Sequence, residues 1–169
     1  INLYKQGKLD EAITTIQQVA QQDPNDAVSR KWLGFLLLQK GNPADALAAL
    51  QEARALNADG ADIRNNLGMA YSGLGQYDKA APEFEQAVKM RKNWAECLDN
   101  LGFAYLKLKQ YEKARDAYSK AVKLAPDNPN IRNNYGLALQ ETGKVDEAKV
   151  DAGAEGAGDR RPRPHVADQ

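Results

Sequence analysis

Residues that most often carry catalysis or bind metal are scarce in this sequence of 169 residues. It holds one cysteine, Cys97, and one histidine, His165. A nucleophile needs a neighbouring base, and a zinc site needs several thiolate or imidazole ligands. Prolines and arginine flank His165, while Cys97 lies near the start of an expected helix, where small buried residues pack. We therefore expect no enzyme activity, no cofactor and no metal site.

The charge balance selects neither nucleic acid nor a membrane as the partner. Lysine and arginine total 23, and aspartate and glutamate also total 23. A protein without a net positive field has no general attraction to phosphate backbones or anionic lipids. The longest apolar run, Leu33 to Leu38, is far too short to cross a bilayer. We expect no nucleic-acid binding and no membrane insertion; the compartment is not defined by the sequence, although we favour the cytoplasm.

Without catalysis or metal binding, the chain could still act by binding another molecule through many weak contacts. An internal sequence repeat predicts the structural elements that would position such contacts. Alanines and two series of glycines recur every 34 residues, and a large apolar residue follows each alanine by four positions. The series are Ala12, Ala46, Ala80, Ala114 and Ala148; Gly34, Gly68, Gly102 and Gly136; Gly7, Gly41, Gly75 and Gly143; and Ile16, Leu50, Phe84 and Tyr118. Series in phase predict an array of repeated units.

Each unit predicts two helices joined by a short turn. Apolar and small residues recur at separations of three and four, which is the spacing of one helix face. Gly41, Asn42 and Pro43 have the pattern of a left-handed helix end, an N-cap and a proline in the first helical turn. Lys109 replaces that glycine in one unit, so we expect a turn strained by about 1 kcal/mol. Pro82 predicts a kink inside a second helix.

The other glycine series, from Gly34 to Gly136, falls inside the predicted first helices. A glycine there costs about 0.5–1 kcal/mol relative to alanine. Close approach of the second helix would offset this cost, and we expect Ala46, Ala80 and Ala114 to make the contact from the other side.

Three segments carry the most specific motifs: Asn66-Leu67-Gly68-Met69-Ala70-Tyr71, Gly75-Gln76-Tyr77-Asp78-Lys79-Ala80, and Asn100-Leu101-Gly102-Phe103-Ala104-Tyr105. They resemble the motifs of the tetratricopeptide repeat family. The resemblance covers residues 1 to about 150 and implies an all-α fold, a right-handed superhelical solenoid of antiparallel helix pairs. Packing between units should differ where the sequence departs from the family: Ala58 and Lys92 replace the usual proline, and Arg30, Arg64 and Arg132 replace a large aromatic residue.

The register of the repeat predicts the organisation of the chain. Complete units span 27–60, 61–94 and 95–128, between partial units at 1–26 and 129–150. The chain begins with Ile1 rather than methionine, so we expect the first helix of the earliest unit to be mostly missing. From Asp151 to Gln169, glycine, proline and charge replace the apolar face, which predicts a disordered tail. An end that is not the natural continuation of the array is the alternative.

The resemblance implies a concave groove lined by the first helices, suited to an extended peptide or a partner helix. One stripe of apolar residues faces this groove at one place per unit: Phe35, Met69, Phe103 and Leu137. Polar residues face it four positions earlier: Lys31, Asn65, Asp99 and Asn133. The apolar stripe either binds a partner or packs between neighbouring helices, and the sequence supports both interpretations.

A ladder of asparagines, Asn66, Asn100 and Asn134, stands three residues before the stripe. It resembles the asparagines with which some superhelical family members, including the repeat region of O-GlcNAc transferase, hold a peptide backbone. An amide side chain donates and accepts at once, so it matches a peptide group without reading sequence. A structural role for the ladder is an equally supported alternative. Trp32 occupies the matching place in the first complete unit, so the ladder stops there.

The pattern of members that bind acidic chaperone tails is broken. Their two-carboxylate clamp needs lysine and asparagine four residues apart, but the sequence has Lys31 and Phe35, and Glu96 stands where the clamp needs lysine. Glu96 and Asp99 would repel an acidic peptide. We therefore expect a protein-interaction scaffold for a different protein or peptide partner. The alternatives are a self-associating module that forms homo-oligomers through its exposed ends, and the targeting arm of a larger enzyme such as an O-GlcNAc-transferase-like protein.

Overall fold

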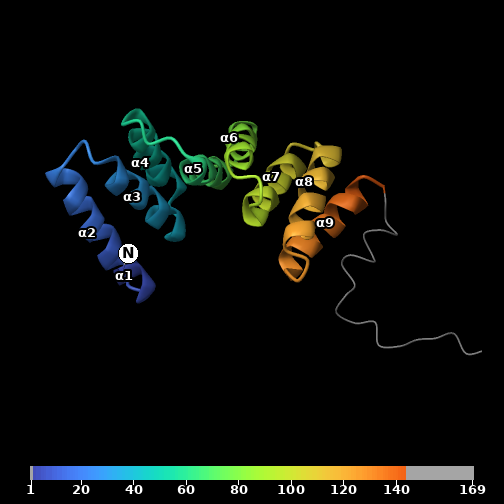
Figure 1. The fold of residues 1–169 in the computed structure, drawn as a ribbon, viewed down its shortest axis with the longest axis horizontal. Coiled ribbons are helices and arrows are strands. Elements are labelled where there is room, and N and C mark those ends of the chain that lie inside the picture. Colours follow the sequence, from blue (N-terminus) through green and yellow to red (C-terminus); the bar gives the residue numbers. More distant parts are fainter. Residues whose placement is uncertain (1, 144–169) are drawn as a thin grey trace, which may run out of the picture.

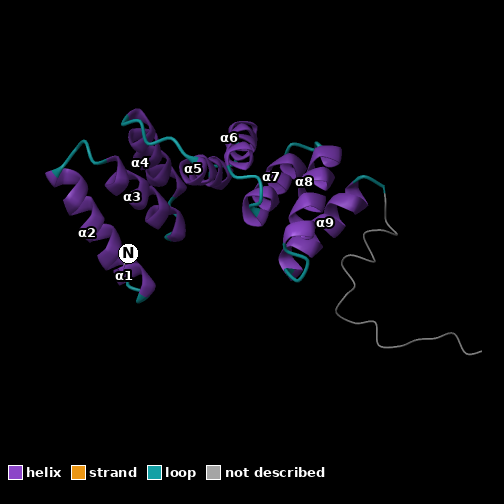
Figure 2. Cartoon of the chain, viewed as in Figure 1, coloured by secondary structure: helices purple, strands orange, loops and turns teal. Residues whose placement is uncertain are grey.

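The computed structural model describes residues 2–143, and this part of the chain consists of helices and turns (Figure 1, Figure 2). A short helix, α1 (Asn2–Lys5), precedes the others. These are α2 (Leu9–Gln22), α3 (Ala27–Gln39), α4 (Pro43–Ala55), α5 (Ala61–Gly73), α6 (Tyr77–Met90), α7 (Ala95–Lys107), α8 (Tyr111–Leu124) and α9 (Pro129–Glu141). Figure 1 shows them following one another in an arch, as a solenoid does. The predicted all-α repeat fold is confirmed, while the predicted tail at 151–169 and His165 lie outside the described residues.

The starts of α3, α4 and α9 are capped by the side chains directly before them. The Asp26 carboxylate accepts a hydrogen bond from the backbone N–H of Val28 at 2.9 Å, and Asn42 accepts from the N–H of Asp45 at 3.3 Å. Asn128 does the same for α9, accepting from the N–H of Asn130 at 3.0 Å. Each cap satisfies a backbone donor that has no partner within the helix. Pro82 lies inside α6, and the kink expected there stays a prediction.

The turns inside the helix pairs use the left-handed backbone conformation, as predicted. Gly7, Gly41, Gly75 and Gly143 have φ angles of 76°, 78°, 73° and 79°. Lys109, at the same place in the pair α7 and α8, has a φ angle of 58°. Glycine adopts this conformation freely, whereas the β-carbon of lysine approaches the backbone. The turn at Lys109 is therefore the strained member of the series.

Replacing Lys109 with glycine should raise the free energy of unfolding by about 1 kcal/mol, because it removes the left-handed strain. The reverse change, Gly75→Lys, should lower it by a similar amount. A β-carbon at Gly75 would meet no atom within 4 Å, so this control tests backbone conformation alone. Urea denaturation followed by circular dichroism measures both. Equal stability of Lys109→Gly and the unchanged protein would contradict the assignment of strain.

The helix pairs interlock at the glycines inside the first helices. A β-carbon built on Gly34 would lie 2.5 Å from Leu50, one on Gly68 would lie 2.6 Å from Phe84, and one on Gly102 would lie 2.8 Å from Tyr118. These distances are too short for any real contact, so the expected close approach is confirmed. The expected alanine contact is secondary, because the nearest atoms belong to the large apolar side chains. Each glycine thus makes room for the large residue of its own unit.

The arginines at the fourth position of three first helices bind groups that a buried aromatic residue could not. Arg30 donates to the carbonyl of Pro24 at 3.4 Å, and Arg132 donates to the carbonyl of Pro126 at 3.5 Å. Arg64 has no proline at the matching place and instead binds Asp59 at 2.6 Å and Glu83 at 2.9 Å. The carbonyl contact is thus shared by two of the three arginines, while Arg30 also binds an acidic partner, Glu52, at 2.6 Å.

Candidate functional site

The curvature of the array places the first helices on its inner side. The backbone of α3 lies close to that of α5, α5 lies close to α7, and α7 lies close to α9, whereas among the described helices the backbones of the second helices α4, α6 and α8 do not approach one another in this way. Helices on the inside of a curved stack lie closer together than those on the outside. The surface of α3, α5, α7 and α9 is therefore the concave one, and we call it the inner groove. Figure 1 shows the arch that it lines.

A cavity of about 300 Å³ opens on the inner groove, between α3, α5 and the start of α7. We call it the tryptophan cavity, because both tryptophans of the chain line it. Its apolar walls are Trp32, Phe35, Met69 and Trp94, and its polar lining is Lys31, Gln39, Asp62, Asn65 and Asn66. Five residues predicted for the groove are thus brought together here: Lys31, Phe35, Asn65, Asn66 and Met69. The remaining predicted residues lie outside this cavity.

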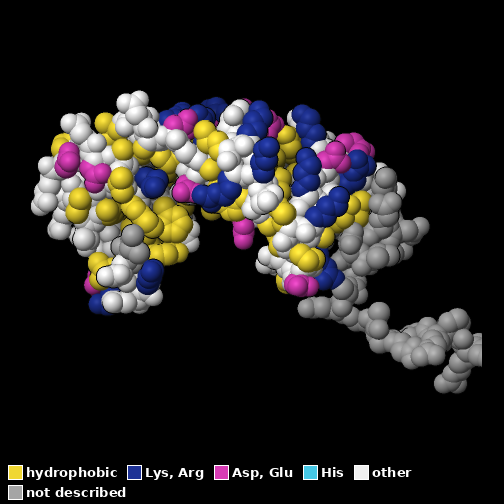
Figure 3. All heavy atoms as spheres, in the orientation of Figure 1, with side chains coloured by type: hydrophobic (Ala, Val, Ile, Leu, Met, Phe, Trp, Pro, Cys, Tyr) yellow, Lys and Arg dark blue, Asp and Glu magenta, His cyan; other side chains and the backbone are white. Residues whose placement is uncertain are grey.

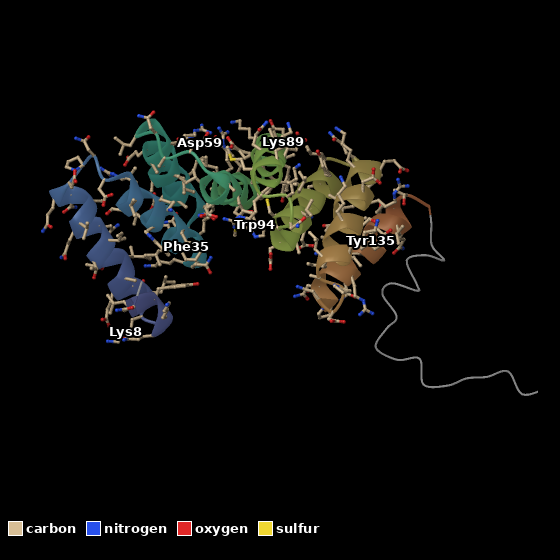
Figure 4. The ribbon with its side chains drawn as sticks, viewed as in Figure 1. Lys8, Phe35, Asp59, Lys89, Trp94 and Tyr135 are labelled. Atoms are coloured by element: carbon tan, nitrogen blue, oxygen red, sulfur yellow. The ribbon has the colours of Figure 1, made fainter. Side chains whose placement is uncertain are left out.

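One wall of the cavity is held by stacked aromatic rings. Phe35 meets the ring of Trp32 edge to face at a centroid distance of 5.7 Å, and it meets Tyr4 of α1 in the same way at 5.4 Å. Such edge-to-face pairs fix the orientation of the rings. Phe35 thus packs on its neighbours and also lines the cavity, so the expected packing is present while the binding of a partner stays a prediction. Figure 4 shows it on the inner side of α3.

The opposite wall is Trp94, which the sequence interpretation did not include. The sequence feature that could have identified Trp94 is its position in the turn directly before α7, because turns usually carry polar residues rather than large aromatic ones. The guanidinium of Arg91 lies over the Trp94 ring at 4.3 Å and also binds Asp62 of α5 at 2.8 Å. This chain of contacts holds the ring in place before any partner arrives. Figure 4 shows Phe35 and Trp94 on the same inner side of the arch.

The asparagine ladder is not uniform. Asn100 donates its amide N–H to the side-chain oxygen of Asn65 at 3.3 Å, and Asn134 donates to Asp99 at 2.9 Å. Both bonds join one first helix to the preceding one. For Asn100 and Asn134 the structure thus favours the structural role over the grip on a peptide backbone.

The C-terminal half of the predicted stripe is open to solvent. Phe103 is 40% exposed and Leu137 is 54% exposed. Phe103 contacts Tyr77 edge to face at 5.9 Å, and the ammonium of Lys107 lies 5.1 Å from its ring. Asn133 is also exposed. The inner groove therefore continues beyond the tryptophan cavity as an exposed apolar surface. Figure 3 shows hydrophobic side chains gathered around α3, while lysine and arginine cover α6 to α8 on the same face of the molecule.

Acidic groups without a positive partner lie on the α7 part of the inner groove. Burial raises the pKa of the Asp99 carboxyl above its usual value, against the hydrogen bond from Asn134, and the charge of Glu96 adds to the shift. The ion pairs of the described residues include neither Glu96 nor Asp99. A partly buried carboxylate without a positive partner lowers stability. This part of the groove would favour a positive group from outside.

Replacing Asp99 with asparagine should raise the free energy of unfolding by about 1 kcal/mol at neutral pH, because the variant keeps the oxygen that accepts from Asn134 and loses the desolvated charge. A raised pKa in the folded state means that the carboxylate lowers stability above that pKa. The gain should therefore shrink as pH falls towards the pKa of an unfolded aspartate, about 3.9. Urea denaturation at several pH values measures this. A gain that is the same at all pH values would contradict the electrostatic explanation.

Three expectations about metal, thiol and membrane can be compared with residues 2–143. No cluster of histidine, cysteine, aspartate and glutamate there could hold a metal ion. Cys97 is fully buried, and burial raises the pKa of its thiol to about 12, so it is the inert core residue that was expected. No helix in this part of the chain combines the length and the apolar character needed to span a membrane.

Comparison with known families identifies the class of protein. Models of the tetratricopeptide repeat match residues 1–26, 26–93, 95–128 and 117–150. The chain therefore belongs to the tetratricopeptide repeat family, as the motifs around Gly68 and Gly102 predicted. Its helical solenoid is the fold of a protein-interaction scaffold.

Solved structures of individual proteins share this fold. MamA superposes with a TM-score of 0.80 at 26% identity, covering 89% of this chain and 88% of that chain. MamA from Desulfovibrio magneticus RS-1, residue 41 to the end, gives 0.81 at 23% identity, with 89% and 85% covered. YrrB, described as a TPR protein with an unusual peptide-binding site, gives 0.76 at 17% identity, with 88% and 77% covered. Curated protein sequences give no match.

Proposed function

We propose that this protein is a scaffold that binds an extended segment of another protein in its inner groove. The binding surface consists of Lys31, Phe35, Asn65, Asn66, Met69, Asp99, Phe103, Asn133 and Leu137, with Trp32 and Trp94 added. Asn100 and Asn134, which were also predicted for the groove, are assigned to the packing of one unit on the next, because they donate to Asn65 and Asp99. The observation that carries the proposal is the tryptophan cavity, whose apolar walls face an open groove and are not covered by residues 2–143. Within the units 27–60, 61–94 and 95–128, the proposed surface uses the first helices and Trp94, which lies in the turn directly before α7.

Two properties of the surface support binding. The walls of the tryptophan cavity are preformed, since Tyr4 and Trp32 hold Phe35 while Arg91 holds Trp94. Preformed apolar cavities with a few polar groups are typical of ligand sites, because little ordering is needed on binding. YrrB shows that the same fold can carry a peptide-binding site. The exposed Phe103 and Leu137 would extend the contact along the groove.

A peptide display library panned on the full chain tests the proposal. Enriched peptides should bind Met69→Gln about tenfold more weakly, because a polar group then enters the apolar wall. Leu124→Gln is the matched control, since Leu124 is 42% exposed on α8, outside the inner groove. Circular dichroism checks that both variants keep their helices. Enriched peptides that bind both variants equally would contradict a site in the groove.

Self-association through the ends of the array makes a different prediction. Light scattering over a wide concentration range should show a monomer if the chain is a scaffold for other proteins. An oligomer that Met69→Gln does not disturb would instead support stacking through the ends. The display experiment also separates a free-standing scaffold from a chain without affinity for peptides.

A further inference from the structure

One repeat position of the inner groove carries an asparagine in three units, and the three side chains differ in their partners. Asn100 and Asn134 each donate to a residue 35 positions earlier in the sequence, Asn65 and Asp99 respectively. Both acceptors are side-chain oxygens on the preceding first helix. These two asparagines are therefore occupied by the packing of one unit on the next.

Asn66 cannot make the equivalent bond. The residue 35 positions before it is Lys31, whose ammonium group has donors only and accepts nothing from an amide N–H. Among the described residues Asn66 has no side-chain hydrogen-bond partner, although it is only 9% exposed. Its amide atoms are not among the fully buried side-chain atoms that lack a partner, so the amide keeps access to solvent and is free to bind a group from outside. This side chain lines the tryptophan cavity.

The surroundings of Asn66 suit a peptide. Its amide group can donate to a main-chain carbonyl and accept from a main-chain N–H, as a peptide group does. Trp32, Met69 and Trp94 beside it offer apolar surface for one large side chain. A polar group that fixes the main chain next to an apolar cavity that accepts a side chain is the usual plan of a site for an extended segment.

The charges of the inner groove favour a basic residue of the partner on the α7 side, beyond Trp94, because Lys31 lines the α3 side of the cavity and would repel one there. Asp62 in the cavity is already paired with Arg91 at 2.8 Å. Glu96 and Asp99, on the helix that begins directly after Trp94, have no ion-pair partner among the described residues. An opposite charge from a partner would satisfy these carboxylates, whereas an acidic segment would be repelled by them.

We propose that the tryptophan cavity binds an extended segment of a partner protein that carries a large apolar side chain and, a few residues away, a lysine or arginine. The main chain is held by Asn66, the apolar side chain enters between Trp32 and Trp94, and the cation faces Glu96 and Asp99. This inference depends on the proposed function, since it names the partner of the same groove. Asn66 is a binding residue, whereas Asn100 and Asn134 hold the units together.

Intrinsic fluorescence offers a direct test, because both tryptophans of the chain line the cavity. The probes are capped alanine peptides that carry one phenylalanine and one lysine at varied separations, titrated against the full chain. Versions with glutamate for lysine, or alanine for phenylalanine, should bind at least about tenfold more weakly. Asp99→Asn should weaken the lysine peptides about tenfold and should not affect versions with an uncharged residue in place of lysine.

The three asparagines provide matched variants at one repeat position. Asn66→Ala should weaken the peptide about tenfold with an unchanged urea midpoint, whereas Asn100→Ala and Asn134→Ala should lower the midpoint and leave affinity within about threefold. Equal loss of affinity in all three would overturn the assignment of Asn66. Display peptides that depend on Met69 but lack basic and large apolar residues would overturn the partner class while the proposed function stands. If no peptide binds in a way that Met69→Gln or Asn66→Ala weakens, both the proposed function and the partner class are overturned. A dimer of the chain that Asn66→Ala dissociates would also overturn both, because the groove would then bind a second copy of this protein.

Discussion

Replacing Phe84 with alanine should lower the free energy of unfolding by about 3–5 kcal/mol, which is the range for a fully buried aromatic side chain. Phe84 is 1% exposed and lies in the core cluster that joins α6 to α7 and α8. Its ring also fills the space that Gly68 leaves open on α5. A methyl group cannot fill that space, and a solenoid has no second layer that could move in. The loss should therefore be close to the full value for a cavity.

Urea denaturation followed by circular dichroism measures this loss. Phe103→Ala is the control, since Phe103 is an aromatic residue of the same array that is 40% exposed, and its removal should cost less than about 1 kcal/mol. Gly68→Ala adds a second test of the interlock. Its β-carbon would lie 2.6 Å from the Phe84 ring, so it should destabilise the unchanged protein and should be tolerated in the Phe84→Ala background. Additive losses in the double variant would contradict the contact.

Replacing Glu83 with glutamine should lower the free energy of unfolding by about 2 kcal/mol, between the values for exposed and fully buried ion pairs. The carboxylate of Glu83 is 13% exposed and binds two guanidinium groups, that of Arg54 at 2.8 Å and that of Arg64 at 2.9 Å. These arginines come from α4 and α5, so the pair of bonds joins three helices. The variant keeps the shape of the side chain but leaves two positive charges facing each other.

The control for Glu83 is an exposed glutamate in a similar pair. Glu112 is 69% exposed and binds Arg115 at 2.7 Å, so Glu112→Gln should cost less than about 0.5 kcal/mol. Arg64 should not compensate in the Glu83 variant, because it already binds Asp59 and holds the pKa of that carboxyl below its usual value. Similar losses for Glu83→Gln and Glu112→Gln would show that burial of the first pair has no effect.

These two predictions concern different consequences of one repeat. The interlock of Phe84 with Gly68 recurs as Leu50 with Gly34 and as Tyr118 with Gly102. Within residues 2–143 the network around Glu83 occurs once, where Arg54 of α4 and Arg64 of α5 bind the same carboxylate. Contacts that recur in every complete unit, such as the glycine interlocks, build the array. Contacts that occur in one unit, such as the Glu83 network, make the units different from one another. The binding surface uses the second kind of contact, because the surroundings of Trp94 and Asn66 are not repeated in the other described units.

The sequence by itself determined the fold of this protein. Residues equivalent to Gly68, Ala80 and Phe84 recur every 34 residues with similar size. This repetition is enough to predict stacked helix pairs. The left-handed turns at Gly41 and Lys109 were also predictable from the sequence, because backbone conformation in a short turn depends mainly on the residues of that turn. The residues Lys31, Phe35, Asn65, Asn66 and Met69 were also selected, because helical pitch determines which side chains share a face.

Only the tertiary structure decided which of these side chains are available to a partner. Identical asparagines became different because the residue available on the preceding first helix differs: Asn65 accepts from Asn100, whereas Lys31 at the matching place before Asn66 has no acceptor. Trp94 joined the site through Arg91 and Asp62, a contact between residues 29 positions apart that no periodic pattern contains. Periodicity describes what the units share. The tryptophan cavity arises where neighbouring units carry different side chains. Whether those side chains meet depends on the packing of helices that are far apart in the sequence, and the repeat pattern does not specify that packing.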